Sequence, residues 1–225
     1  MLRRRGTRLP RLRRESDIIV AARAVFAECG YEDASMAAIA RRAGVVEGTI
    51  YTYFDGKRDL LNTVLVRWYE GMLADQADAL AGITGLRNRL RYVVWRHLRT
   101  VATEPGLCRL FFLEVRSAGG YPDSELYALN RGYTRAAVQV LQEGIASGEL
   151  RSDAPLRLVR DVVFGAIEHH TWQFLSGRGA LDVDALADTL SDLVLDGVRV
   201  AEAAPVIERL EHLAHRLEHA VGRRP

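Results

Sequence analysis

The sequence predicts an all-α protein with a small N-terminal helical domain and a larger helical body. Apolar residues recur at spacings of three and four through most of the 225 residues. No segment alternates apolar and polar residues as a half-buried strand would. Glycine and proline separate the periodic segments, and 48% hydrophobic residues are enough to fill sizeable cores. We therefore expect three parts, at residues 1–14, 15–61 and 62–225.

The first part, residues 1–14, is a basic arm. It holds seven arginines and no acidic residue, and it lacks apolar periodicity. Such a segment has too little apolar surface to form a core, so we expect it to be disordered when free. It is either a nucleic-acid arm that reaches phosphates or the minor groove, or a solvated tail. A supporting helix is expected next, over about Ser16–Cys29, with Gly30 as its stop.

The stretch from Ser35 to Gly44 predicts the first helix of a helix-turn-helix. Ser35 is a favourable N-cap, and Ile39 lies on an apolar stripe at helical spacing. Gly44 follows the last periodic residue, where a glycine readily takes the left-handed conformation that ends a helix.

A second helix is expected from about Glu47 to Tyr53. Ile50 and Phe54 are four residues apart and should face the small core. Val46 stands at the N-cap position of this helix and has no side chain that can accept a hydrogen bond. The missing cap costs about 1 kcal/mol of helix stability. The outward face is then formed by Glu47, Gly48, Thr49, Tyr51, Thr52 and Tyr53.

Periodicity predicts further helices through the rest of the chain. They are expected at 57 to beyond 80, 86–104, 107–117, 123–146, 156–175, 183–201 and 205–221. The first of these would begin in the N-terminal domain and end in the body, as a rigid link between them. The last one, with an apolar stripe at spacings of three and four, would either fold back over the body or add to a dimer contact.

Positive charge is unevenly distributed. The arm is strongly basic, whereas residues 15–57 carry four basic and seven acidic side chains, a net charge of −3. Lys57 is the single lysine in a chain with 31 basic residues. The arm should therefore supply most of any attraction for a polyanion.

The residues Ala-Gly-Val-Val-Glu-Gly-Thr-Ile-Tyr-Thr-Tyr-Phe-Asp-Gly-Lys, at 43–57, resemble the signature of TetR-family transcriptional regulators. The resemblance covers about residues 17–61. It implies a homodimer that binds double-stranded operator DNA and a small-molecule effector, most often as a repressor that the effector releases. By the same resemblance, segments 156–175 and 183–201 would form the dimer.

The resemblance and the outward face together give candidate DNA-binding residues. Ser35 would cap its helix and touch a phosphate, Gly48 would allow close approach of the backbone, and Thr49 would read a base edge. The full expected set is Arg3, Arg4, Arg5, Ser35, Ala37, Glu47, Gly48, Thr49, Tyr51, Tyr53 and Lys57.

Aromatic residues of the body give a candidate effector pocket, because ligand pockets are mostly apolar. Expected lining residues are Trp95, Phe111, Phe112, Tyr127, Tyr133 and Trp172, although at helical spacing each of these is also a plausible core residue. Arg109, Arg116 and Arg135 are candidates for an anionic head group, or simply surface residues. Residues 144–174 resemble the C-terminal domains of TetR-type regulators of lipid metabolism, which favours an acyl-type or other apolar effector.

Motifs of other classes are incomplete. We find no nucleophile elbow or phosphate-binding loop, so we expect no enzyme activity and no cofactor. Asp182, Asp184 and Asp188 lack the rest of a calcium loop, and Glu168-His169-His170 lacks the spacing of a zinc site. The histidines at 212, 215 and 219 share one side of the last helix and could hold a metal, but the glutamates among them favour a solvated face, so no metal is expected. Apolar runs are too short for a membrane span, and no signal peptide is visible. Cys29 and Cys108 are expected to be packing residues of a cytoplasmic protein.

The alternative function is an effector-independent DNA-binding activator or architectural protein.

Overall fold

The computed structural model describes residues 8–200, apart from the side chains of residues 8–10 and 77. Within this range the chain is helical and contains no strand, only an isolated bridge between Leu150 and Arg199. The helices are α1 (Arg8–Cys29), α2 (Met36–Ala43), α3 (Glu47–Ile50), α4 (Lys57–Ala81), α5 (Leu86–Thr103), α6 (Pro105–Leu110), η1 (Phe111–Val115), η2 (Tyr121–Asp123), α7 (Glu125–Ala146), α8 (Leu156–Leu175) and α9 (Val183–Val198). The expected helix at 205–221 and residues 1–7 of the arm lie outside the described residues.

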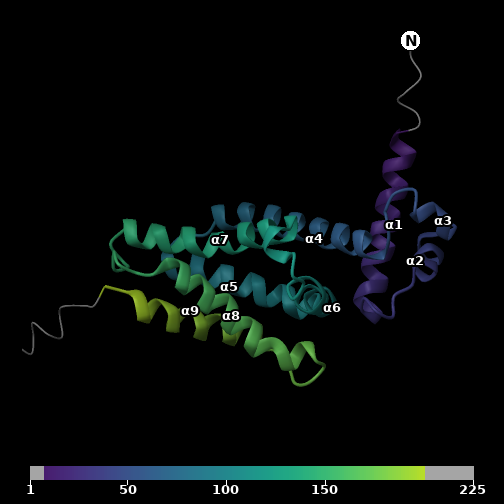
Figure 1. The fold of residues 1–225 in the computed structure, drawn as a ribbon. Helices are drawn as coiled ribbons and strands as arrows, with labels where there is room; N and C mark the ends of the chain where they lie inside the picture. Colours follow the sequence, from purple (N-terminus) through teal and green to yellow (C-terminus); the bar gives the residue numbers. More distant parts are fainter. Residues whose placement is uncertain (1–7, 201–225) are drawn as a thin grey trace, which may run out of the picture.

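Helices α1, α2 and α3 form a small unit at one end of an elongated body (Figure 1). Helix α4 starts in this unit and continues into the body, where it packs along α7. Helices α5, α8 and α9 form the other side of the body, and α5 packs most extensively on α9. The expected all-α architecture and the bridging role of α4 are both confirmed.

Two clusters of buried apolar side chains hold the fold together. One lies within the far part of the body, around Leu90, Leu141 and Leu195. The other runs without a break from Phe26 in α1 to Tyr133 in α7. The small unit and the near part of the body therefore share one core, and a movement in one is felt by the other because packed interiors transmit strain.

Three expected elements differ from the observed ones. Helix α1 begins at Arg8 instead of Ser16, so residues 8–14, expected to be disordered, continue the helix. Regular α3 ends at Ile50, and the chain continues to Phe54 in tighter turns, with the Tyr53 amide donating to the Ile50 carbonyl at 2.9 Å. The segment expected at 107–117 is α6, which starts earlier at Pro105, followed by the π-helix η1. Proline suits the first turn of a helix because it has no N–H to leave unpaired there.

Candidate DNA-binding surface and effector cavity

The α2–turn–α3 geometry follows from two local residues. Ser35 Oγ accepts a hydrogen bond from the Ala38 amide at 3.1 Å, as an N-cap does. Gly44 has φ 67°, and the Val45 amide donates to the Ala40 carbonyl at 3.0 Å, which turns the chain into α3. Val46 provides no side-chain cap. Ser35 thus uses its hydroxyl within the fold, and its predicted phosphate contact remains a prediction.

The outward face of α3 is as the spacing predicts. Ile50 and Phe54 are buried, while Tyr51 is 52% exposed. A Cβ added to Gly48 would meet nothing within 4 Å, so the fold itself does not require a glycine there. Of the other predicted DNA-binding residues, Ala37 and Glu47 are exposed and Thr49, Tyr53 and Lys57 are partly exposed. Arg3, Arg4 and Arg5 lie outside the described residues.

Lys57 is engaged within the protein. Its ammonium donates to the Glu32 carbonyl at 3.2 Å and to the Ala34 carbonyl at 2.9 Å, and it lies 4.4 Å from the Tyr31 ring centroid. It therefore fastens the α1–α2 loop to the start of α4. An ammonium has three donors, so a phosphate contact would use the one that remains. Local sequence pattern does not predict this internal role, because the partners are more than 20 residues away.

Exposed arginines of α1 add positive charge near α3. The guanidinium of Arg11 lies 5.6 Å from the Tyr53 ring centroid. This arginine is therefore beside residues 47–54, the recognition segment formed by α3 and the turns that follow it. Arg13 and Arg14 are exposed. Within the described range, Arg11, Arg13 and Arg14 form no ion pair with a carboxylate. The basic character expected of a disordered arm is thus partly carried by a helix.

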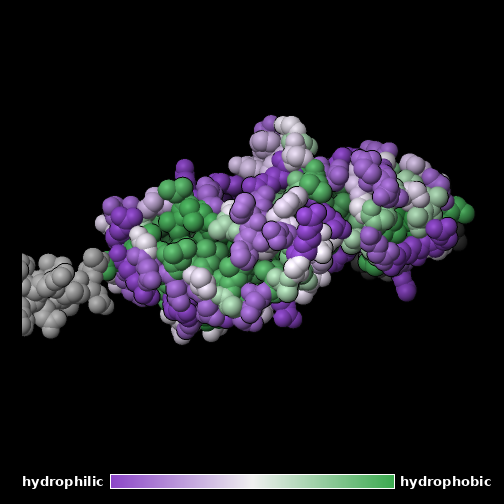
Figure 2. All heavy atoms as spheres, turned by 90° about the horizontal axis from the view of Figure 1, so that it is seen from below, coloured by the Kyte–Doolittle hydropathy of each residue, from purple (hydrophilic) through white to green (hydrophobic). Residues whose placement is uncertain are grey.

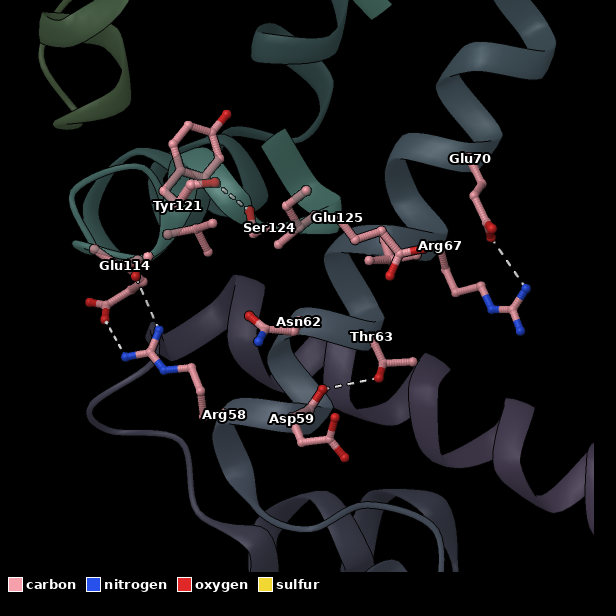
Figure 3. Close-up of a pocket in the computed structure, with 15 residues that line it drawn as sticks. Arg58, Asp59, Asn62, Thr63, Arg67, Glu70, Glu114, Tyr121, Ser124 and Glu125 are labelled. Atoms are coloured by element: carbon pink, nitrogen blue, oxygen red, sulfur yellow. Dashed lines mark hydrogen bonds and ion pairs between the residues drawn. The ribbon is translucent and has the colours of Figure 1, made fainter. Parts of the chain in front are cut away.

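A groove of about 730 Å³ separates the start of α4 from η1, η2 and α7 (Figure 3). Arg58 reaches across it: its guanidinium donates to the Glu114 carbonyl at 3.1 Å and lies 3.6 Å from the Glu114 carboxylate. The same guanidinium lies 4.2 Å from the ring centroid of Tyr31. Arg67, on the same helix, pairs only with Glu70 beside it. Arg58 therefore links the small unit to η1, and Arg67 does not.

Two more contacts join the small unit to the body. Arg23 of α1 pairs with Glu104, just before α6. Gly106 lies against the backbone of α1, and a Cβ there would come within 2.4 Å of the Ala27 carbonyl oxygen. Only glycine allows α6 and α1 to approach this closely.

A cavity of about 280 Å³ lies between α4, α5, η1, α7 and α8. Four of the six predicted pocket residues line it, namely Phe111, Phe112, Tyr127 and Tyr133. Trp95 lies instead beside Tyr92 in a separate surface hollow, and Trp172 is 44% exposed on α8. The spacing of aromatic residues along a helix does not show which of its faces points inward. The sequence therefore could not distinguish Trp95 and Trp172 from the residues that line this cavity.

Sequence reasoning missed most polar residues of this cavity. Asn130 donates to the Tyr121 hydroxyl at 2.9 Å and lies 3.4 Å from the Tyr69 hydroxyl. Arg116, Arg131 and Arg160 also line it. Arg116 pairs with Glu168 and Arg160 with Asp161, while Arg131 forms no ion pair within the described residues.

Of the three arginines predicted for a head group, Arg116 alone lines the cavity. Arg109 donates to the Leu175 carbonyl at 3.1 Å, and Arg135 is exposed elsewhere on α7.

Two buried titratable side chains of the cavity, His97 and Cys108, are uncharged at neutral pH. Burial lowers the pKa of His97 to about 4, so its imidazole is neutral. Burial also raises the pKa of the Cys108 thiol to about 12, which removes it as a nucleophile. The site is therefore suited to binding an apolar group, with positive charge near arginines on its wall.

Exposed apolar side chains gather along α8 and α9. Figure 2 shows hydrophobic residues on this face, and Leu158, Val162, Trp172 and Leu193 are between 44% and 69% exposed. Their spacing in α8 places Leu158 and Val162 one turn apart. Such a face is typical of a protein contact surface.

Other classes of site were also sought in residues 8–200. In this range no three histidine, cysteine or acidic side chains are grouped as metal ligands. None of the described helices is both long and apolar enough to cross a membrane. The histidines at 212–219 lie outside the described residues.

Comparison with known proteins matches both halves of the chain. Residues 18–64 match the family described as bacterial regulatory proteins, tetR family, and residues 84–198 match the tetracyclin repressor-like C-terminal domain. The chain belongs to the TetR family. As a TetR-family protein it is a DNA-binding transcriptional regulator, which confirms the predicted fold and class.

Several relatives regulate lipid metabolism. The fatty acid metabolism regulator protein of Bacillus subtilis is 28% identical over 80% of this chain and 93% of its own length. The transcriptional activator FasR of Mycolicibacterium smegmatis is 41% identical, over 40% of this chain and 42% of its own. The structure of FadR from Bacillus subtilis in complex with stearoyl-CoA has a TM-score of 0.72 and 28% identity, covering 82% of this chain and 99% of that one.

Proposed function

We propose that this TetR-family regulator is a repressor, acting in the cytoplasm, that leaves its operator when an acyl-CoA binds the cavity. The observation that supports this most is the composition of the cavity. Eight aromatic side chains contribute to its walls, together with three arginines. Arg116 and Arg160 pair with the lining carboxylates of Glu168 and Asp161, and Arg131 has no such partner among the described residues. An acyl chain fits the apolar part, and guanidinium groups bind phosphates well. The relative solved with stearoyl-CoA has the same fold.

The route from the cavity to DNA would pass through η1. Phe111 and Phe112 of η1 line the cavity, and Glu114, two residues later, holds Arg58 at the start of α4. A ligand that displaces these phenylalanines would therefore move the partner of Arg58. Arg58 in turn contacts Tyr31 in the small unit. The π-helix η1 is a suitable moving part, because such segments are rare and are frequently found at functional sites.

The operator-bound form would be a homodimer. The recognition segment reads few base pairs alone, and a two-fold partner adds a second half-site. The apolar face of α8 and α9 is the surface best suited to self-association. Leu193→Glu should then give monomers in sedimentation, whereas persisting dimers would move the interface elsewhere.

The effector proposal is tested by fluorescence anisotropy on labelled DNA from upstream of the coding gene. Stearoyl-CoA should release the DNA, while free CoA should not, because it lacks the chain. Arg131→Gln should raise the stearoyl-CoA concentration needed for release. Arg135→Gln is the matched control, since Arg135 is one turn away on α7 and does not line the cavity. DNA binding that no acyl-CoA changes would exclude this effector class.

The runner-up is an activator or architectural protein that needs no effector. The similarity to the activator FasR supports it over part of the chain. It predicts DNA binding that is indifferent to every ligand, together with transcription that falls when the gene is deleted.

A further inference from the structure

Three buried polar groups in the cavity walls are without hydrogen-bond partners. They are the Tyr133 hydroxyl, Nδ1 of His97 and Nε1 of Trp68, each shut off from solvent and unpaired among the described residues. Tyr133 is 1% exposed and Trp68 is 8% exposed. All three residues line the same cavity, from α7, α5 and α4. An unpaired buried polar group is costly, so three around one cavity need an explanation.

Two other tyrosines of this cavity, Tyr69 and Tyr121, are different. The hydroxyls of Tyr69 and Tyr121 both lie within hydrogen-bonding reach of Asn130. Thr100 and Thr134, also in the wall, donate to backbone carbonyls of their own helices. The Thr100 hydroxyl is a neighbour of the Tyr133 hydroxyl, but the two do not form a hydrogen bond of normal geometry. The fold thus satisfies the neighbouring polar groups and leaves Tyr133, His97 and Trp68 unsatisfied.

The rings of His97 and Tyr133 are neighbours, and the ring of Tyr69 lies between Trp68 and Tyr133. The rings of His97 and Tyr133 are 5.7 Å apart between centroids, and Phe164 packs on His97 at 5.0 Å. The ring centroids of Trp68 and Tyr69 are 5.3 Å apart, and those of Tyr69 and Tyr133 are 6.3 Å apart. The surroundings are therefore aromatic.

We propose that Tyr133, His97 and Trp68 bind oxygen atoms of the effector, so that the preferred ligand is an acyl-CoA with a hydroxyl or keto group in its chain. The tyrosine hydroxyl and the indole N–H can each donate to such an oxygen. A ligand hydroxyl can also donate to an unprotonated imidazole nitrogen. This inference rests on the proposed function, and it narrows the ligand class.

The discrimination has a physical basis. A saturated chain bound among these groups leaves all three unpaired, whereas an oxygenated chain pairs them without opening the site to water. Sites that bury polar groups in this way reject analogues that lack the matching atom. One recovered hydrogen bond corresponds to about tenfold in affinity.

The test compares wild type, Tyr133→Phe and Tyr69→Phe. Each variant removes one hydroxyl from the same cavity, but the Tyr69 hydroxyl lies within reach of Asn130. Calorimetry would use stearoyl-CoA and a set of its mid-chain hydroxylated and keto derivatives. Wild type should bind at least one oxygenated compound about tenfold more tightly than stearoyl-CoA. Tyr133→Phe should lose that preference and keep its affinity for stearoyl-CoA, and Tyr69→Phe should retain the preference.

Thermal unfolding without ligand gives a second readout. Tyr133→Phe should raise the melting temperature because it deletes an unpaired hydroxyl, while Tyr69→Phe should lower it. A lower melting temperature for Tyr133→Phe would show that a buried water already satisfies the hydroxyl, and would overturn the inference. If Tyr133→Phe does not fold, Trp68→Phe tests the same preference.

The outcomes separate the two proposals. Wild type that binds stearoyl-CoA and its oxygenated derivatives equally would overturn this inference and leave the acyl effector in place. Wild type that binds none of these compounds would overturn the acyl-CoA proposal itself.

Discussion

Lys57 and Arg58 are adjacent in sequence and bind different neighbours. Lys57 closes the small unit by donating to carbonyls of the α1–α2 loop, and Arg58 reaches Glu114 in the body. Both cations lie near the ring of Tyr31. The charged residues at the start of α4 thus hold the two parts of the molecule together before any DNA is bound.

Tyr51 is the exposed residue of the recognition segment that tests its role most simply. Tyr51→Ala should weaken binding to all DNA sequences about equally, because a phosphate contact positions the protein without reading bases. Thr49→Ala should instead change the preference at one base pair. Binding of a randomised DNA pool by both variants checks this. Unchanged affinity of folded Tyr51→Ala would move the DNA-binding face away from α3.

His97 should make stability depend on pH. Its pKa falls from an unfolded value near 6.5 to about 4 because burial disfavours the imidazolium. The unfolded chain therefore binds more protons between these values, and stability falls as the pH drops through this window, by up to roughly 3 kcal/mol. Urea unfolding at pH 7 and pH 4.5 should show a larger loss for wild type than for His97→Leu. Equal losses would mean that His97 is protonated in the folded state.

At the scale of elements, α6 and η1 are the part that periodicity describes least well. The sequence places a single helix at 107–117, and the structure has a short α-helix that widens into a π-turn. Widening at Phe111 leaves Glu114 facing Arg58. Such a change in hydrogen-bond register depends on packing from several helices, so local spacing does not predict it.

Gly106 allows α6 to contact α1, and Gly106→Ala should disturb that contact. The added methyl group would lie 2.4 Å from the Ala27 carbonyl oxygen, which the backbone of α1 must move to accommodate. We expect a loss of about 1–3 kcal/mol in unfolding free energy. Gly132→Ala on α7 is the control, since its nearest neighbour is a Leu73 methyl at 3.7 Å, and it should stabilise by about 0.5–1 kcal/mol. A neutral Gly106→Ala would mean that α6 and α1 are less tightly packed.

Much of the fold could be predicted from local pattern. Caps, turn glycines and periodicity located α2, α3, α7, α8 and most of α4, and the spacing of Ile50 and Phe54 gave the buried side of α3 correctly. Contacts between residues far apart in the sequence could not be predicted from local pattern. Arg58 and Glu114 are 56 residues apart, and the aromatic residues of the cavity look the same in sequence as Trp95 and Trp172 outside it.

At the scale of the whole molecule, positive charge is concentrated at the end that carries α3. The first turns of α1 project at that end (Figure 1), and Arg11 lies beside Tyr53. The rest of the small unit is net acidic, so attraction for DNA should depend on these arginines.

Replacing Arg11, Arg13 and Arg14 by Gln should therefore flatten the salt dependence of DNA binding. Each phosphate contact adds about 0.9 to the slope of log affinity against log salt, so three contacts in each subunit of a dimer would remove about 5. Base preference should persist. An unchanged slope in the triple variant would assign the phosphate contacts to other residues, including those outside the described range.

If a ligand in the cavity releases DNA as proposed, the cavity and the DNA-binding surface are coupled through Arg58. Isothermal titration of stearoyl-CoA, with and without saturating operator DNA, measures this coupling. By linkage, operator should weaken stearoyl-CoA binding by the factor with which stearoyl-CoA weakens operator binding, about 5- to 150-fold. Arg58→Leu should reduce that factor, and Arg67→Leu, which removes only a pair within α4, should not. Equal stearoyl-CoA affinity in the two wild-type titrations would contradict the account.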